Sequence, residues 1–261
     1  MRPLLAAFRI GFTHVFAYRT EVVIQLVSAA IVAGLNASLW TVAGRGRATI
    51  AGIPSVEMVS YVVIAWVSVS FVATRVNDEI GRRFRDGAIA SDLVRPLGIQ
   101  GFWYARDLGR ALACLGLQTA PLLLLCLAVF DVQLPARPST WLLWGLSLLL
   151  AHATNYGLSF LVGLAAAHLQ DVSGLSHLKG TLVSVFSGAL IPLELFGATL
   201  RPFVFALPFH AMVHSPASIF LERDIDVGGV LIEQAAWAFA LWGVGAWAWR
   251  VATRHLIVAG G

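Results

Sequence analysis

Long apolar runs recur along the whole chain, and they constrain its fold more than any other feature. The first of them, residues 22–43, contains no charged side chain. About 20 consecutive apolar residues in a helix are enough to cross the hydrocarbon core of a bilayer. Only 12% of the residues are charged, whereas soluble domains average about 25%. The sequence therefore predicts an all-α integral membrane protein, because a helix satisfies its backbone polar groups internally.

Six apolar runs are expected to be membrane spans. Apolar sequence extends from end to end, which leaves no room for a separate soluble domain, so residues 1–261 are expected to form a single transmembrane domain. The expected spans are residues 22–43, 57–74, 108–130, 141–170, 180–193 and 227–250.

The fifth run is short, and a segment rich in proline follows it. Glu194 interrupts the run, and prolines at positions 192, 202, 208 and 216 break the stretch that comes next. Irregular backbone at membrane depth is tolerated only where it is buried in protein or lines a wet cavity. We therefore expect residues 192–226 to form a re-entrant helical hairpin on the outer side, between spans five and six.

Four residues of this outer segment are candidates for a gate: Pro192, Glu194, Pro208 and His210. A carboxylate at membrane depth is costly and usually faces protein or water, which makes Glu194 and Glu233 functional candidates. The alternative, which we weigh equally, is that both carboxylates lie at the level of the outer head groups, where they cost little.

The N-terminal segment has its own helical pattern. Apolar residues recur at helical spacing over residues 2–19, and three arginines flank or interrupt that face. This pattern predicts an amphipathic helix over residues 1–20 that lies in the membrane interface. The apolar residues are Leu5, Phe8, Phe12, Val15 and Phe16. The alternative is a frayed end of the first span.

The basic residues are distributed unevenly between the two sides. If the N-terminus is cytoplasmic, 13 of the Lys and Arg residues lie inside and 5 lie outside. Cytoplasmic loops carry an excess of basic residues, so both termini are expected to be cytoplasmic. This orientation also places residues 76–107 in the cytoplasm.

Residues 76–107 are the longest strongly charged stretch, and apolar runs lie on both sides of it. The stretch carries both signs of charge and an apolar stripe at helical spacing, which exceeds what is needed to fix topology. We expect a short amphipathic helix that a soluble partner grips, ending before Pro96. The candidate contact residues are Asp78, Glu79, Ile80, Arg82, Arg83, Phe84, Arg85, Asp86, Ile89 and Arg95. The alternative is a loop whose arginines only set the orientation.

The sequence contains only weak matches to phosphate-binding, metal-binding and catalytic motifs. Lys179-Gly180-Thr181 lacks the leading glycines of a phosphate-binding loop. His168, Asp171 and His177 are close in sequence, but a solvated loop is a better interpretation than a metal site. Serines such as Ser159 are more often helix-packing residues than nucleophiles. We therefore expect no catalytic residue, no metal and no cofactor in this chain.

Three parts of the chain resemble the permease subunits of ABC type-2 exporters, closest to a six-span branch often described as drug or antibiotic export components. Residues 79–97 are similar to the cytoplasmic segment of that family, with acid–Ile, then Gly–small–Ile, then Leu-x-Arg-Pro-Leu. Residues 186–217 resemble the end of its fifth span and its outer hairpin, through Ser-Gly-x-x-Ile-Pro-Leu, Leu-Pro-Phe and Pro-Ala. The third part is Arg254-His255-Leu256 with Gly260-Gly261. One departure is Gly197, where the family often has proline.

The resemblance implies two permeases and two copies of an ATP-binding subunit, in the bacterial cytoplasmic membrane. ATP and Mg²⁺ would be bound by that subunit, and residues 78–95 would be the coupling helix seated in its groove. The second permease would be a homologous chain or a second copy of this one. A hydrophobic or amphiphilic substrate, such as a drug, a lipid or a peptide, would pass between the permeases along spans one, two and five.

Three alternatives stay open at this point. A transmembrane component of an importer would also have a charged cytoplasmic helix. The second alternative is a membrane enzyme that acts on lipids, and the only feature that favours it is the i, i+4 spacing of His210 and His214. A structural subunit without transport is the third. Membrane lipid is an expected partner in every case, and no nucleic acid is expected.

Overall fold

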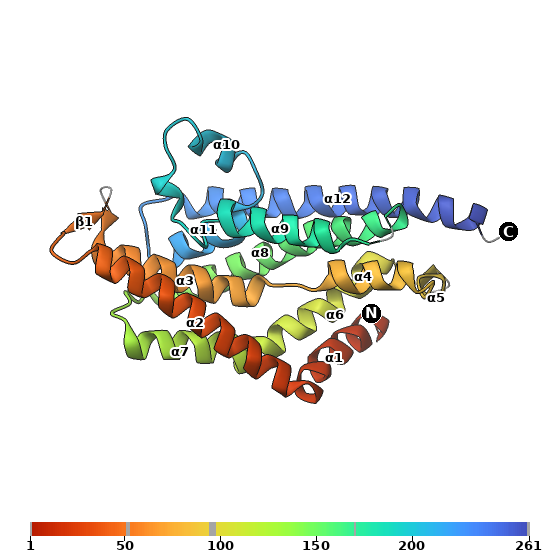
Figure 1. Ribbon diagram of the computed structural model, residues 1–261, viewed down its shortest axis with the longest axis horizontal. Coiled ribbons are helices and arrows are strands. Elements are labelled where there is room, and N and C mark those ends of the chain that lie inside the picture. Colours follow the sequence, from red (N-terminus) through yellow and green to blue (C-terminus); the bar gives the residue numbers. More distant parts are fainter. Residues whose placement is uncertain (1, 51–52, 94–97, 170, 260–261) are drawn as a thin grey trace.

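The computed structural model describes residues 2–50, 53–93, 98–169 and 171–259 of the chain. They form an elongated bundle of helices with one small antiparallel sheet (Figure 1). The first half contains α1 (Arg2–Ala17), α2 (Arg19–Ala43), β1 (Thr49–Ile50), β2 (Ile53–Pro54), α3 (Ser55–Val72), α4 (Val76–Arg85), α5 (Ala90–Leu93), α6 (Ile99–Cys114), the π-helical turn η1 (Leu115–Thr119) and α7 (Ala120–Val129). The second half contains α8 (Pro138–Leu164), η2 (Ala165–Ala167), α9 (Ser173–Phe186), η3 (Leu193–Leu195), α10 (Arg201–Phe205), α11 (His210–Phe220) and α12 (Val227–Ala259).

Five segments among the described residues are long and apolar enough to cross a membrane. They are Arg19–Ala43, Ser55–Arg85, Ile99–Val129, Pro138–Ala167 and Val227–Thr253. Apart from the short β1–β2 ribbon, the fold is helical, as the apolar runs predict.

The fifth of the six expected spans is the one without a long helix. Its helix, α9, has 14 residues, which gives about 21 Å at 1.5 Å per residue, less than the roughly 30 Å of a hydrocarbon core. Gly188 has a φ of 87°, a left-handed conformation that favours glycine and ends the helix. Pro192 and η3 follow, so the chain beyond α9 continues in an irregular path.

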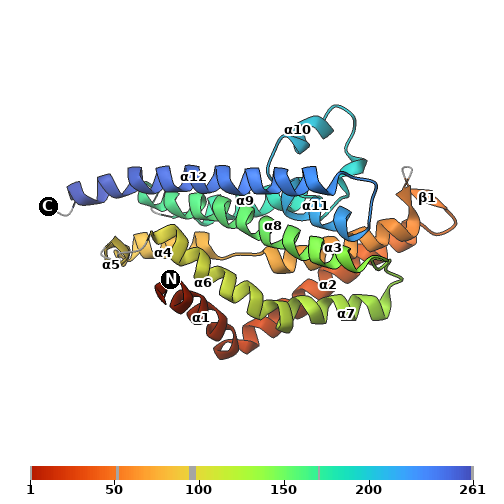
Figure 2. The ribbon, with the colours of Figure 1, turned by 180° about the vertical axis from the view of Figure 1, so that it is seen from behind.

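The elements divide between two ends of the bundle. Both termini, α4 and α5 lie at one end, which we call the α4 end (Figures 1 and 2). The β1–β2 ribbon lies at the opposite end, and α10 projects from the side of the bundle in the half that contains the ribbon; we call this half the α10 end. The charged stretch and the proline-rich segment are therefore on opposite sides of the bundle, as the sequence predicts.

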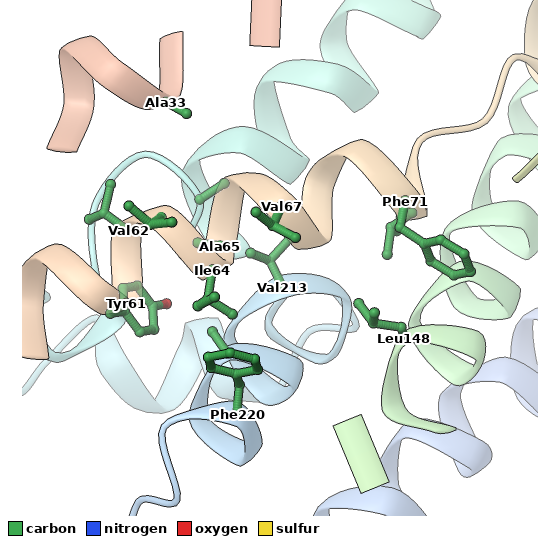
Figure 3. Close-up of a cluster of buried hydrophobic side chains, with 14 of the residues drawn as sticks. Ala33, Tyr61, Val62, Ile64, Ala65, Val67, Phe71, Leu148, Val213 and Phe220 are labelled. Carbon is green, nitrogen blue, oxygen red and sulfur yellow. The ribbon is translucent and has the colours of Figure 1, made fainter. Parts of the chain in front are cut away.

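The centre of the bundle is formed by α3 and α11. Most side chains of α3 are buried, and α11 packs against α3, α8 and α12. Figure 3 shows side chains of α3, including Ile64 and Val67, close to Val213 and Phe220 of α11. Lipid tails are as apolar as these side chains, so close van der Waals packing stabilises such a core more than exclusion of water does.

The helix that contains the third expected span begins earlier than that span does. Its helix starts at Ile99 rather than near Leu108, and it continues through η1 and α7 to Val129. Because Arg106 and Asp107 are charged, the sequence analysis placed them in the charged stretch before the span. In the folded chain Arg106 pairs with Glu79 at 3.1 Å, and Asp107 pairs with Arg110 at 3.1 Å, so these charges are compatible with a helix.

The N-terminal helix α1 is present, and it crosses α6 at two glycines. A Cβ atom on Gly11 would overlap the carbonyl oxygen of Arg106, and one on Gly109 would overlap that of Phe8. Small residues at a crossing allow two helix backbones to approach closely. The opposite face of α1 leaves apolar side chains such as Leu5 and Phe16 exposed, as a helix beside lipid would.

This crossing predicts that Gly109→Ala destabilises the chain, because the added methyl group has no space beside Phe8. Overpacking of this kind costs about 1–3 kcal/mol. We expect a lower midpoint of thermal unfolding in detergent and faster proteolysis of residues 2–17. Gly116→Ala is the matched control, because a Cβ on Gly116 meets nothing within 4 Å. Equal stability of the two variants would contradict the close crossing.

Candidate functional site

The charged stretch forms α4 and α5 at the α4 end. Asp78 and Glu79 lie in the first turn of α4, and Arg82, Arg83 and Arg85 lie in its last turn. Acidic residues at a helix N-terminus and basic residues at its C-terminus complement the helix dipole. This charge order explains why so polar a segment is helical.

The apolar stripe of α4 faces the body of the protein. Ile80 is fully buried, and Phe84 packs against the same apolar cluster. Gly163 of α8 makes room for this contact, because a Cβ there would lie 2.9 Å from that of Ile80. Ile89 is buried as well. These three predicted contact residues therefore hold α4 in place, and the polar side of the helix faces away from the body of the protein.

The polar side of α4 is open to solvent at its tip. Asp78, Arg82, Arg85 and Asp86 are exposed. Arg85 lies 3.4 Å from Asp171, a pair in which both side chains are more than half exposed; such pairs contribute little to stability. The side chain of Arg82 makes no ion pair or hydrogen bond with the part of the chain that the structure describes. A partner can therefore reach these four side chains directly.

Arg83 has a different place from its neighbours, since it closes the turn between α4 and α5. Its Nε donates to Asp92 at 2.5 Å, and its Nη2 donates to Ala88 O at 3.2 Å and to Ser91 Oγ at 3.0 Å. Gly87, with a φ of 68°, allows the tight turn. Asp92 is 2% exposed, so Arg83 supplies positive charge next to a buried carboxylate.

Trp103 of α6 connects the α4–α5 turn to the other elements of the α4 end. The guanidinium groups of Arg83 and Arg106 lie 5.5 and 4.9 Å from the centre of its ring, within the range of cation–π contacts. Arg106 also pairs with Glu79 of α4 at 3.1 Å. A cavity of about 580 Å³ opens beside these groups, between α1, α4 and α6. The sequence did not indicate Trp103 or Arg106; their i, i+3 spacing in a predicted loop was the only signal.

Arg95 is the one predicted contact residue that lies outside the described residues. The other nine predicted contact residues all lie on α4 or on the turn that follows it. It separates them into exposed groups and groups that contact the body of the protein.

The junction between α3 and α4 is held by residues that the sequence analysis missed. Residues 73–75 are not helical, which leaves backbone carbonyls without their usual partners. Asn155 Nδ2 of α8 donates to Val72 O at 2.9 Å, and Arg110 Nη2 of α6 donates to Ala73 O at 2.5 Å. Asp107 lies 3.1 Å from Arg110. A polar amide within an apolar run, as at Asn155, was the available signal.

The α10 end carries a second polar cluster. Arg223, which follows α11, pairs with Glu194 and, at 2.9 Å, with Glu57 of α3. Tyr61 Oη lies 3.1 Å from His214 Nδ1. Glu57 and Tyr61 were not predicted, because both are remote in sequence from the outer segment, residues 192–226. Arg223 lies within that segment but was not singled out.

The four gate candidates do not form one group. Glu194 belongs to the Arg223 cluster, whereas His210 Nε2 lies 3.0 Å from Glu233 of α12. Pro192 precedes η3 and Pro208 lies in the turn before α11, so both shape the backbone. Nearby, Glu222 accepts hydrogen bonds from Thr140 and from the Arg137 and Ala136 amides, which lower the pKa of its carboxyl.

The weaker motifs have structural explanations. Asp171 accepts hydrogen bonds from the hydroxyl and amide of Ser173, and these bonds lower its pKa. Ser159 is fully buried, and its hydroxyl donates to Asn155 O at 2.7 Å. Within the described ranges, no three His, Cys, Asp or Glu side chains could together hold a metal ion.

The Arg83 contacts predict that Arg83→Gln loosens the turn after α4. Hydrogen bonds to charged groups contribute about 1.5–3 kcal/mol, and the substitution removes the charged contact between Arg83 and Asp92. We expect amide hydrogen exchange in residues 86–92 to accelerate by at least ~10-fold, or about 1.4 kcal/mol. Arg82→Gln, one residue earlier and exposed, should leave that exchange unchanged. Similar exchange in both variants would show that Arg83 does not close the turn.

Comparison with known proteins identifies the family to which this chain belongs. The sequence model of the family described as "ABC-2 family transporter protein" matches residues 30–260. Searches of curated proteins and of solved structures returned no significant match. The match includes the three parts on which the resemblance was noted, residues 79–97, residues 186–217 and, up to residue 260, the C-terminal part. This chain therefore belongs to the ABC-2 transporter family, and it is the membrane component, or permease, of such a transporter.

Proposed function

We propose that this chain is the permease subunit of an ATP-driven exporter of hydrophobic or amphiphilic molecules. The observation that carries the proposal is the polar side of α4, which projects at one end of an apolar bundle and is not covered by the residues that the structure describes. Membership of the ABC-2 family supports a partner that hydrolyses ATP. ATP and Mg²⁺ are bound by that partner, in two copies per assembly.

In this proposal α4 is the coupling helix. Asp78, Arg82, Arg85 and Asp86 contact the ATP-binding subunit, and the cavity between α1, α4 and α6 receives part of it. Ile80, Phe84, Ile89 and Arg83 hold the helix so that it moves together with α8. Glu79, paired with Arg106, connects α4 to α6.

The proposed topology has six crossings, with both termini on the cytoplasmic side of the bacterial cytoplasmic membrane. The common position of the termini and α4 at one end of the bundle supports it (Figure 1). The fifth crossing consists of α9 and the irregular residues 187–192. The hairpin of α10 and α11 re-enters from the outer side, and α1 lies in the cytoplasmic interface.

A second permease completes the assembly, either a second copy or a homologous chain. Helices α2 and α9 support this proposal, because most of α2 is exposed and no residue of α9 is buried. Asn36 of α2 reaches Leu190 O, which follows α9, at 3.4 Å. The export path lies between the two permeases and is lined mainly by α2, α3 and α9.

The proposal predicts that the full chain, purified in mild detergent, retains a subunit with a phosphate-binding loop. Mass spectrometry of the purified sample identifies that subunit and also any second permease of similar size. The ATP-binding subunit should be stoichiometric with the permeases. A chain that purifies alone in several detergents contradicts the exporter assignment, and a lipid-acting membrane enzyme then becomes the alternative to test.

The exposed side of α4 predicts the effect of Arg82→Glu. A reversed charge at an interface opposes association, because like charges then face each other. We expect ATPase activity measured with the permease to fall by at least ~10-fold, equivalent to about 1.4 kcal/mol. Thermal stability should not change, because Arg82 has no partner among the described residues.

The matched control is Arg45→Glu, since Arg45 is an exposed arginine at the α10 end. It should leave the ATPase activity of the complex intact. If Arg82→Glu keeps full activity at normal expression, α4 is not the coupling helix.

A further inference from the structure

A groove of about 340 Å³ runs beside the α3–α4 junction. This volume is within the range of small-molecule sites, roughly 300–1,000 Å³. Helices α2, α3 and α6–η1 form its walls. Ile24 of α2 and Trp66 and Val69 of α3 supply apolar surface along it. The groove therefore offers a surface for a hydrocarbon chain within the predicted membrane-spanning region.

Two charged side chains line the groove at its end near the α3–α4 junction, and both are cations. They are Arg75 and Arg110, and no carboxylate lines the groove in the described part of the chain. Their acidic partners, Glu21 and Asp107, line the neighbouring cavity instead. Each guanidinium has five N–H donors, and neither uses all of them on the described residues. An anionic group in the groove would meet these remaining donors.

Gln118 provides an independent indication of a ligand. This residue of the π-helical turn η1 lines the groove and is only 6% exposed. Its amide makes no hydrogen bond with any residue that the structure describes. The next residue, Thr119, is fixed to α3 by Ser70, whose hydroxyl lies 3.1 Å away. An amide without a protein partner is costly at membrane depth, and π-helical turns recur at functional sites.

We propose that this groove binds an amphiphile with an anionic head group. The head group lies against Arg75 and Arg110, the amide of Gln118 hydrogen-bonds to the polar part of the molecule, and its hydrocarbon chain follows Ile24, Trp66 and Val69. The assignment of this ligand as export substrate rests on the proposed function. The binding itself requires neither ATP nor the ATP-binding subunit.

The test measures binding to the full chain, together with any subunit that stays bound, by native mass spectrometry. Lysophosphatidylglycerol is the anionic probe, and lysophosphatidylcholine with the same acyl chain is the zwitterionic control. We expect one anionic molecule per chain, with at least ~10-fold higher affinity than the control. Inorganic phosphate should not displace it at equal concentration, because phosphate has no hydrocarbon chain.

Three variants locate the site. Ser28→Trp fills the groove from the exposed face of α2 and should lower the affinity at least ~10-fold. Arg75→Gln should remove most of the head-group preference, and Gln118→Leu should weaken binding about threefold without lowering thermal stability. Ser38→Trp is the matched control, since Ser38 is exposed on the same helix but does not line the groove.

The outcomes separate this proposal from its alternatives. Unchanged binding in Ser28→Trp, or equal binding of the two lysolipids, overturns it. Displacement by inorganic phosphate alone shows a site for a free anion and also overturns it. If Ser28→Trp splits an oligomer and the wild-type chain binds no lysolipid, the groove is an interface between copies of the chain. If binding occurs as expected but no ATPase copurifies, the site stands and the exporter assignment fails.

Discussion

The hydrogen bonds at the α3–α4 junction are the constraint on which the arrangement of this protein depends. A helix that stops inside a bundle exposes carbonyl oxygens, and at membrane depth no water is available to satisfy them. Asn155 and Arg110 supply the missing donors from α8 and α6. Because of these bonds, the central helix can end at Val72 and a separately oriented helix can begin at Val76.

The same junction determines what α4 presents to its surroundings. With α3 and α4 separated, α4 packs against α8 through Ile80 and the space left by Gly163. Its polar side then projects from the α4 end, while the Arg83 contacts fix the turn that follows. The groove of about 340 Å³ lies beside the same junction, so motion of α4 and occupancy of the groove would both act on Arg75 and Arg110.

Several features of the fold follow directly from the order of residues. The charge-free run of residues 22–43 predicts α2, and the prolines after residue 191 predict that no long helix continues there. The helix of the fifth expected span was harder to predict, because hydropathy does not show that Gly188 takes a positive φ and ends α9 after 14 residues. The start of the helix that contains the third expected span was not predicted, for a related reason. Charges that pair across helices look, in the sequence alone, like charges in a solvated loop.

By itself, the sequence determined that the chain is a helical membrane protein and that its charged stretch and its proline-rich segment lie on opposite sides of the bundle. It did so because transfer of charges and unpaired backbone groups into hydrocarbon is so unfavourable that composition alone decides these points. Only the tertiary structure decided which face of α4 is turned inward, and that Arg83 contacts the α4–α5 turn while Arg82 is exposed. It also decided that Arg223 joins Glu57 to Glu194. Such pairings depend on the distance and direction between helices that are remote in sequence, and no local pattern of residues contains that information.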